Sequence, residues 1–134
     1  MKQKKLTLSV LKGIFGVLRL EKGSEVPEWI YESNFFSITR TPEELSIVCQ
    51  ESSIPLNIPA GILTERDWSC LKVEGPLDFG LTGILAGISS ILAENGVSIF
   101  AVSTYDTDYI LVRETDLVRA VRALIEGGYE IRKS

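Results

Sequence analysis

The segment that decides the fold reads GVSIFAVSTYDTDYILVRE and spans residues 96–114. In it two apolar runs flank a polar turn at residues 104–109, a pattern that predicts a β-hairpin. A second stretch, FFSITRTPEELSIV at residues 35–48, aligns on residues 99–112 without a gap, at an offset of 64 positions. A match at a fixed offset, with the turn in the same place, indicates internal duplication. The chain is therefore predicted to contain two related units.

Two helices are predicted on either side of the hairpin. Apolar residues recur at spacings of three and four in the segment before it and in the segment after it, as amphipathic helices require. These positions are Leu81, Ile84, Leu85, Ile88, Ile91 and Leu92 in the first segment, and Leu117, Val118, Val121, Leu124 and Ile125 in the second. Asn95-Gly96 and Gly127-Gly128 are expected to end the helices, and Thr115 is expected to cap the start of the second.

Strands complete this unit over residues 68–132. Residues 68–74 alternate between apolar and polar side chains, which predicts a half-buried strand, and residues 129–132 are expected to form the last strand. Residues 97–104 are apolar on both alternations, which predicts a central strand covered on both faces. The resulting order is strand, helix, strand, strand, helix, strand. Two helices on one face of a four-stranded antiparallel sheet form the ferredoxin-like arrangement.

The first half of the chain resembles a degenerate copy of this unit. Strands are expected at residues 5–11, 16–21, 35–40 and 45–50. Pro55, Pro59 and Gly61 exclude a continuous second helix, whereas Pro27 is tolerated at the start of one or two helical turns. The predicted fold class is α+β, with two ferredoxin-like (βαββαβ) units paired edge to edge: a degenerate one at residues 1–66 and a complete one at residues 67–134.

Composition limits the chemistry. The 134 residues are 45% apolar, which is enough to fill a core. Histidine is absent, so no side chain has an unperturbed pKa near neutrality and no imidazole is offered to a metal. Cys49 and Cys70 form no CxxC motif, which favours a cytosolic thiol protein over a disulfide-built one. We therefore expect no catalytic residues, no metal ligands and no cofactor.

The charge pattern argues against two classes of partner. The net charge is −4 and the basic residues form no stripe, so nucleic acid is not expected as a partner. The basic start MKQKK precedes an apolar run that Lys12 and Gly13 interrupt, too short for a signal or a membrane span. We expect a soluble, cytoplasmic protein that binds neither nucleic acid nor a membrane.

Small residues line the polar side of the first predicted helix, at Gly83, Ala86, Gly87 and Ser90. A solvated helix usually carries Lys or Glu there, so these positions indicate that another group approaches closely. That group is either the other repeat or a second subunit for the face as a whole, or a ligand at Gly83 in the first turn.

Two stretches carry a resemblance to a known family. FSITRTPEELSIVC at residues 36–49, together with residues 70–112, closely resembles small bacterial tandem-ACT proteins, which are related to the ACT domains of the cytosolic arginine sensors of animals. The resemblance implies an amino-acid-sensing regulatory module and not a catalyst. It also implies that a small ligand, usually an amino acid, binds where ACT units pair.

The resemblance further implies a set of ligand contacts. They are Asp78, Leu81, Gly83, Ile84 and Leu85 at the start of the first helix, and Ser103, Thr104, Tyr105 and Asp108 around the hairpin turn. Asp108 matches an acidic residue that contacts the ligand in the arginine sensors. Leu81 departs from them, because an acidic residue there faces the basic end of arginine. The identity of the ligand is therefore open between arginine and less basic amino acids.

Elementary chemistry makes the same positions suitable for an amino acid. A helix start offers unpaired amides to the ligand's carboxylate, Gly83 permits close approach, and Asp108 can face the ammonium group. Leu81, Phe100 and Tyr105 would supply an apolar wall. The alternatives are structural: Asp78 and Asp108 as loop and turn residues, and Gly83 as a packing glycine.

Two functions follow from these observations. The first is a ligand-responsive module that forms a homodimer and acts through an effector protein, since the chain carries no visible effector domain. The second is a ligand-free assembly or adaptor protein that uses the ACT fold for protein–protein pairing. An enzyme is the weakest alternative, because no nucleophile–base pair can be assembled from the sequence.

Overall fold

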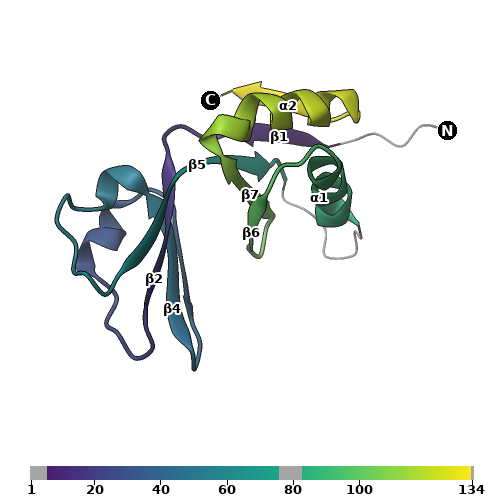
Figure 1. The fold of residues 1–134 in the computed structure, drawn as a ribbon. Coiled ribbons are helices and arrows are strands. Elements are labelled where there is room, and N and C mark those ends of the chain that lie inside the picture. The colour runs from purple at the N-terminus through teal and green to yellow at the C-terminus, as the bar shows by residue number, and fades with distance from the viewer. Residues whose placement is uncertain (1–5, 76–82, 134) are drawn as a thin grey trace. The chain divides into compact units, whose positions relative to one another are not determined.

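The computed structural model describes residues 6–75 and 83–133, which separate into two compact units (Figure 1). Unit 1 contains the described residues up to Lys12 together with those from Ser69 onward, and unit 2 contains Gly13–Trp68. The expected division at residues 66 and 67 differs from this one, because the first strand of the chain pairs with strands of unit 1.

Unit 1 has the predicted order of helices and strands. Its elements are β1 (Thr7–Val10), residues 69–73 of β5 (Leu63–Val73), α1 (Ile84–Glu94), β6 (Ile99–Ser103), β7 (Asp108–Arg113), the 3-10 turn η3 (Glu114–Asp116), α2 (Leu117–Glu126) and β8 (Glu130–Lys133). From β5 onward this is the βαββαβ sequence of a ferredoxin-like unit. The α+β fold class is confirmed.

The sheet of unit 1 has the order β6-β7-β5-β1-β8, so β1 lies between the first and last strands of the βαββαβ unit. Leu8 of β1 is opposite Val73 in an antiparallel pair and opposite Ile131 in a parallel pair. The prediction of four antiparallel strands was wrong on both counts, because β1 adds a strand and one parallel pairing. The prediction of a central strand at residues 97–104 was also wrong, since β6 pairs with β7 alone among the described strands.

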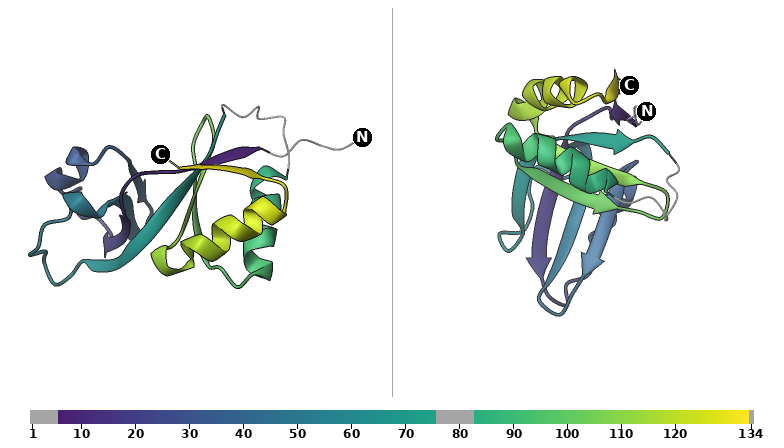
Figure 2. Two further views of the ribbon diagram at one scale, coloured as in Figure 1. Left: turned by 90° about the horizontal axis from the view of Figure 1, so that it is seen from above. Right: turned by 90° about the vertical axis from the view of Figure 1, so that its right-hand side faces the viewer.

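One core joins both helices to one face of this sheet. Ile88 and Leu92 of α1 are completely buried, as is Leu124 of α2, and they pack with strand residues such as Leu71 and Val112. Figure 2 shows α1 and α2 in two further orientations. Of the apolar positions that the periodicity predicted, Ile88 and Leu92 are buried, Ile84, Leu85 and Ile91 pack partly against the core, and Leu81 lies outside the described residues.

The ends of the helices follow the predicted pattern in part. Gly96 and Gly128 adopt the left-handed conformation, with φ of 70° and 98°, which only glycine accepts without strain. Thr115 does not cap α2, because it lies within η3 and Asp116 occupies the N-cap position. At Gly87 a Cβ atom would lie 3.0 Å from the hydroxyl of Tyr129, a residue of the same unit and not of the other repeat, a second subunit or a ligand as predicted for this face.

Unit 2 repeats this order with short turns in place of helices. Its elements are β2 (Phe15–Glu21), the 3-10 turn η1 (Glu28–Glu32), β3 (Phe36–Arg40), β4 (Glu44–Gln50), the 3-10 turn η2 (Glu51–Ser53) and the start of β5. Its sheet order is β3-β4-β2-β5, which corresponds to β6-β7-β5-β8 of unit 1 without the inserted β1. Pro27 precedes η1 as expected. The first copy is thus degenerate in its helices and intact in its strand order.

The two hairpins share a topology but not a register. Phe36 pairs with Cys49, whereas Phe100 pairs with Leu111 and not with Arg113, the position that the offset of 64 requires. A shift of two residues leaves each side chain on its original face of the sheet, because side chains alternate with a period of two. The apolar patterns of the hairpins therefore coincide even though their partners differ.

Both cysteine thiols are free and buried. Desolvation by burial raises the pKa of the Cys49 thiol to about 11, against an opposing effect of the Arg66 charge, and raises that of Cys70 to about 12. The thiolate is the reactive form, and at neutral pH almost none of it is present when the pKa is this high. Both thiols are therefore expected to be unreactive in the folded protein.

We expect neither cysteine of the native protein to be alkylated by iodoacetamide at pH 7, and both to react after denaturation. Since the folded pKa values lie above the unfolded value of about 9, stability from the protonated thiols is complete below about pH 9 and is lost as pH rises toward 11–12. Mass spectrometry measures the labelling and urea titrations at several pH values measure the stability. Rapid labelling of the native protein would show that the thiols are accessible.

Candidate ligand site of unit 1

The turn between β6 and β7 is held by threonine hydroxyls. The Thr104 amide donates to the Thr107 carbonyl over 2.8 Å, and the Thr104 hydroxyl donates to the same oxygen over 3.1 Å. The buried Thr107 hydroxyl donates to the Val73 carbonyl over 2.6 Å. This last bond fastens the turn to Val73, the last residue of β5.

Asp108 lies directly across the hairpin from Ser103. The Ser103 hydroxyl donates to the Asp108 Oδ1 atom over 2.5 Å. Ser103 is exposed and Asp108 is half-buried, so the carboxylate remains within reach of a solute. The carboxylate thus accepts a hydrogen bond from a side chain on the neighbouring strand.

The N-cap residue of α1 is a glycine. Gly83 occupies the N-cap position with φ of 76° and ψ of 5°, and within the described part of the chain no side chain caps the helix. A Cβ atom at Gly83 would meet no described atom within 4 Å, so glycine is needed there for its backbone conformation and not for packing. In the right-hand view of Figure 2 the start of α1, the β6–β7 turn and the end of β5 lie toward the same end of unit 1.

The structure describes most of the predicted ligand contacts. Gly83, Ile84 and Leu85 begin α1, with Ile84 and Leu85 packed partly against the core, and Ser103, Thr104, Tyr105 and Asp108 form the hairpin end. Tyr105 is 81% exposed. Asp78 and Leu81 lie outside the described residues.

Sequence reasoning missed the contribution of Thr107. Two aspartates flank it in a polar turn, so it resembles a solvated residue, yet its side chain is only 4% exposed. The signal in the sequence was the β-branched side chain of Thr107 between Asp106 and Asp108. Such a side chain is better suited to packing against a strand than to a solvated turn.

Replacing Thr107 with valine should lower the free energy of unfolding by about 1–3 kcal/mol, because the buried Val73 carbonyl loses its partner while the side-chain volume is kept. Urea unfolding measures the change. The matched control is Thr115→Val, at an exposed threonine of η3. Equal effects of the two substitutions would show that the bond to Val73 contributes nothing.

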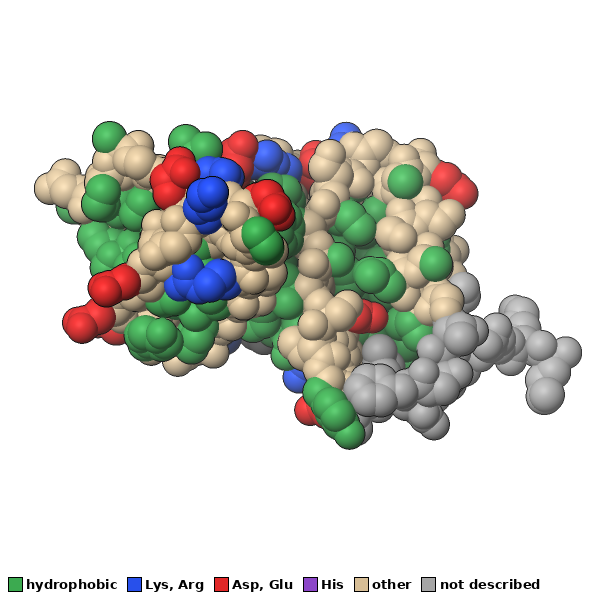
Figure 3. Space-filling view, turned by 90° about the horizontal axis from the view of Figure 1, so that it is seen from below, with side chains coloured by type: hydrophobic (Ala, Val, Ile, Leu, Met, Phe, Trp, Pro, Cys, Tyr) green, Lys and Arg blue, Asp and Glu red, His purple; other side chains and the backbone are tan. Residues whose placement is uncertain are grey.

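The described residues contain neither a candidate metal site nor a candidate membrane-spanning helix. No group of three or more His, Cys, Asp and Glu side chains that could hold a metal ion occurs within residues 6–75 and 83–133. In the same part of the chain no helix is long and apolar enough to cross a membrane. On the face drawn in Figure 3, Lys and Arg side chains are interspersed with Asp and Glu, so no basic stripe is seen on that face.

The fold and the hairpin end define an α+β protein with two ferredoxin-like units. Unit 1 carries a cluster of hydroxyl and carboxylate groups at the end of its β6–β7 hairpin. Comparison with family models agrees with this class. The model of the ACT domain matches residues 63–126, and a second model, described as an N-terminal domain, matches residues 13–57. The chain belongs to the ACT-domain family.

Curated relatives include the protein "Cytosolic arginine sensor for mTORC1 subunit 1". The bovine protein is 37% identical over 97 residues, which are 67% of this chain and 30% of the relative. The human protein is 35% identical over 99 residues, 69% of this chain and 30% of the relative. The chain therefore spans less than a third of the length of these relatives.

Solved structures match over most of the chain. Protein Atu0741 from Agobacterium tumefaciens has a TM-score of 0.87 and 38% identity, covering 98% of this chain and 96% of that one. The regulatory subunit of aspartate kinase from Thermus thermophilus has a TM-score of 0.60 and 9% identity, covering 90% and 97%. The second likeness concerns the fold alone.

Proposed function

We propose that this chain is an amino-acid-binding regulatory module without catalytic activity of its own. The family supports this function, as do the arginine-sensor relatives. The observation that carries the proposal is the pairing of Ser103 with Asp108 at the same end of unit 1 as the uncapped start of α1.

Asp108 would bind the ammonium group of the ligand. The Ser103 hydroxyl donates to Oδ1 and so holds the carboxylate in one orientation. Oδ2 can then accept a charge-assisted hydrogen bond from the ammonium, which is stronger than a bond between neutral groups. The Thr107–Val73 bond fixes the turn that carries this carboxylate.

The first turn of α1 would bind the ligand's carboxylate. Backbone amides at a helix start lack partners within the helix, and the helix dipole favours an anion there. Gly83 has no Cβ atom, so no side chain at this position stands between the ligand and the backbone amides of Ile84 and Leu85. Thr104 and the exposed Tyr105 would contact the ligand on the hairpin side. Asp78 and Leu81, which lie outside the described residues, are further contacts that the family resemblance implies.

Binding regulates only if it favours one arrangement of the protein over another. In this proposal the two states differ in the pairing of two copies of the chain, and the output passes to an effector protein in the cytoplasm. The departure at Leu81 leaves the amino acid open between arginine and a less basic one.

A thermal-shift screen of the twenty amino acids tests the proposal. A ligand at one hundred times its dissociation constant stabilises the folded state by about 2.7 kcal/mol, which raises the melting temperature measurably. We expect one amino acid, or a small related group, to produce this shift. A screen without any shift at millimolar concentrations would contradict the proposal and favour the ligand-free adaptor.

A further inference from the structure

The hairpins of the two units end in the same turn. In unit 1 the Thr104 amide and hydroxyl both donate to the Thr107 carbonyl, over 2.8 and 3.1 Å. In unit 2 the Thr41 amide and hydroxyl donate to the Glu44 carbonyl, over 2.9 and 3.4 Å. Thr41 is therefore the structural counterpart of Thr104, although the offset of 64 that the apolar pattern gives places Thr41 on Tyr105.

Counted from this turn, the position of Asp108 in unit 2 belongs to Leu45. The last strand pair before the turn is Ser103 with Asp108 in unit 1 and Arg40 with Leu45 in unit 2. Leu45 is completely buried in the core of unit 2. Unit 2 therefore has a buried aliphatic side chain where unit 1 has the carboxylate that is proposed to bind the ligand's ammonium group.

Glu44 does not replace this carboxylate, although the offset of 64 places it on Asp108. Side chains alternate between the two faces of a strand, so Glu44 and Leu45 point to opposite faces of β4. Leu45 is on the face that packs into the core, and Asp108 shares its own face with the core residue Ile110. The Glu44 carboxylate lies on the other face, where it is 4.0 Å from Nε of Arg19.

Arg40 takes the place of Ser103 and closes this end of unit 2. Its guanidinium donates to the Ser24 carbonyl over 2.7 Å. Ser24 lies between β2 and η1, in the segment that corresponds in chain order to the one between β5 and α1. In unit 1 the proposed ligand would connect the hairpin end to the helix start. In unit 2 an arginine of the chain itself connects the hairpin end to the segment before the helical turn.

The helical turn of unit 2 is also unsuited to the ligand's carboxylate. η1 is five residues long, Pro27 precedes it, and Glu28 places a negative charge in its first turn. Proline has no amide hydrogen to donate, and an acidic side chain already occupies the end of the helix that favours an anion. The eleven-residue α1 starts after Gly83, and no acidic residue is found in its first turn.

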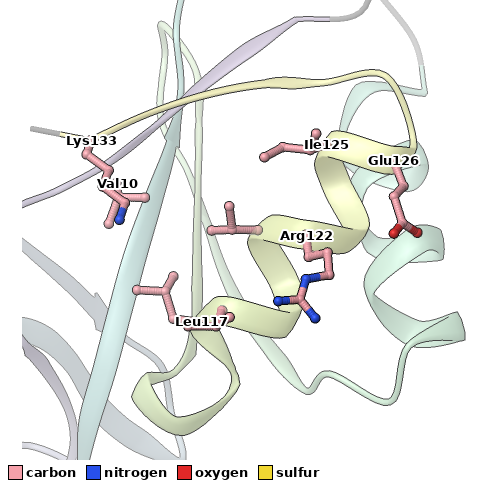
Figure 4. Close-up of a pocket in the computed structure, with 8 residues that line it drawn as sticks. Val10, Leu117, Arg122, Ile125, Glu126 and Lys133 are labelled. Atoms are coloured by element: carbon pink, nitrogen blue, oxygen red, sulfur yellow. The ribbon is translucent and has the colours of Figure 1, made fainter.

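A hollow of about 480 Å³ beside α2 on unit 1 does not supply another amino-acid site (Figure 4). In Figure 4 the Arg122 guanidinium and the Glu126 carboxylate lie on the same side of α2, away from Val10 and Lys133. The other residues that line the hollow are aliphatic: Leu117, Val118, Val121 and Ile125. An ammonium group in the hollow would therefore meet aliphatic carbon and the like charge of Lys133.

We propose that the chain has a single amino-acid site, in unit 1, and that Leu45 and Arg40 exclude a second one from unit 2. This inference rests on the proposed function. In unit 2 the ammonium group of a ligand would face an aliphatic side chain and a guanidinium, and a charge that is buried without a counter-charge is strongly disfavoured. With one site in each chain, cooperative binding can arise only between copies of the chain and not within one chain.

Calorimetric titration of the full chain with each of the twenty amino acids counts the sites. We expect one bound molecule per chain for every amino acid that binds. Asp108→Asn should remove the saturable binding. Glu44→Gln, the same change at the residue that the sequence offset places on Asp108, should leave both the stoichiometry and the affinity unchanged.

Two bound molecules per chain, or a stoichiometry that Glu44→Gln lowers, would overturn the single-site proposal and leave the proposed function intact. Titrations in which none of the twenty amino acids shows saturable binding would contradict the proposed function, and the single-site proposal with it.

Hydrogen exchange tests the role of Arg40 without any ligand. Arg40→Ala should speed amide exchange in residues 22–27 severalfold, because the hydrogen bond that holds this segment to β3 is lost. Arg66→Ala is the control, since Arg66 pairs with Glu51 elsewhere in unit 2, and it should leave exchange in residues 22–27 unchanged. Unchanged exchange in Arg40→Ala would refute the closure of unit 2 by Arg40.

Discussion

Replacing Ile88 with alanine is expected to lower the free energy of unfolding of unit 1 by about 2–5 kcal/mol. Ile88 is completely buried in the core that α1 and α2 share with the sheet. Truncation removes favourable burial and leaves a cavity that its neighbours fill only partly. Because folded proteins are stable by only about 5–15 kcal/mol, this loss is a large fraction of the total.

Urea unfolding followed by circular dichroism at 222 nm measures this effect. Both described α-helices belong to unit 1, so the helical signal reports on that unit. Ser90→Ala, at an exposed position of the same helix, is the control and should change stability by less than about 0.5 kcal/mol. A cost below about 1 kcal/mol for Ile88→Ala would mean that α1 is not packed on the sheet as described.

Asp108→Ala should abolish the thermal shift produced by the amino acid found in the screen. The ligand's ammonium loses its counter-charge, and a hydrogen bond between charged groups contributes roughly 1.5–3 kcal/mol, which corresponds to a weakening of about ten- to one-hundred-fold or more. The melting temperature without ligand should change little, because Asp108 is only half-buried and its recorded bond is to an exposed serine.

Asp106→Ala is the matched control for this experiment. Asp106 lies in the same turn, is exposed and carries the same charge, so the substitution changes the net charge equally. The ligand-induced shift should persist in Asp106→Ala and disappear in Asp108→Ala. An intact shift in Asp108→Ala would mean that the amino acid binds elsewhere. Loss of the shift in both variants would mean that binding depends on the net charge of the turn and not on Asp108 itself.

The hairpins show which parts of the fold can be predicted from local sequence pattern. Alternating apolar residues on either side of a polar turn marked both β3–β4 and β6–β7, and helical spacing marked the buried positions Ile88 and Leu92. These features depend on neighbours along the chain, which is why they can be read from sequence. The short turns of unit 2 were foreseen for the same reason, since proline and glycine act on their own backbone.

The residues of the candidate site were predicted from the family resemblance and remain a prediction, whereas their geometry could not be predicted from the sequence. Applied to the pair Thr39 and Ser46, the fixed offset would place Ser103 opposite Ile110, whereas the structure places it opposite Asp108. The contact between hydroxyl and carboxylate therefore depends on a hairpin register that the duplicated pattern does not contain. The anchoring of Thr107 likewise depends on a strand distant in sequence, because its hydroxyl donates to the Val73 carbonyl.

The sequence by itself determined the α+β class, the duplicated hairpin and the order of elements, because hydrophobic periodicity and turn chemistry act over a few residues. Only the tertiary structure decided that β1 enters unit 1 between β5 and β8, and that α2 buries Leu124 while Val118 and Ile125 stay exposed. Strand pairing and helix rotation depend on which hydrogen-bonding edges and apolar surfaces meet across long separations in the chain. Those meetings place Asp108 beside Ser103 and open the hollow beside α2.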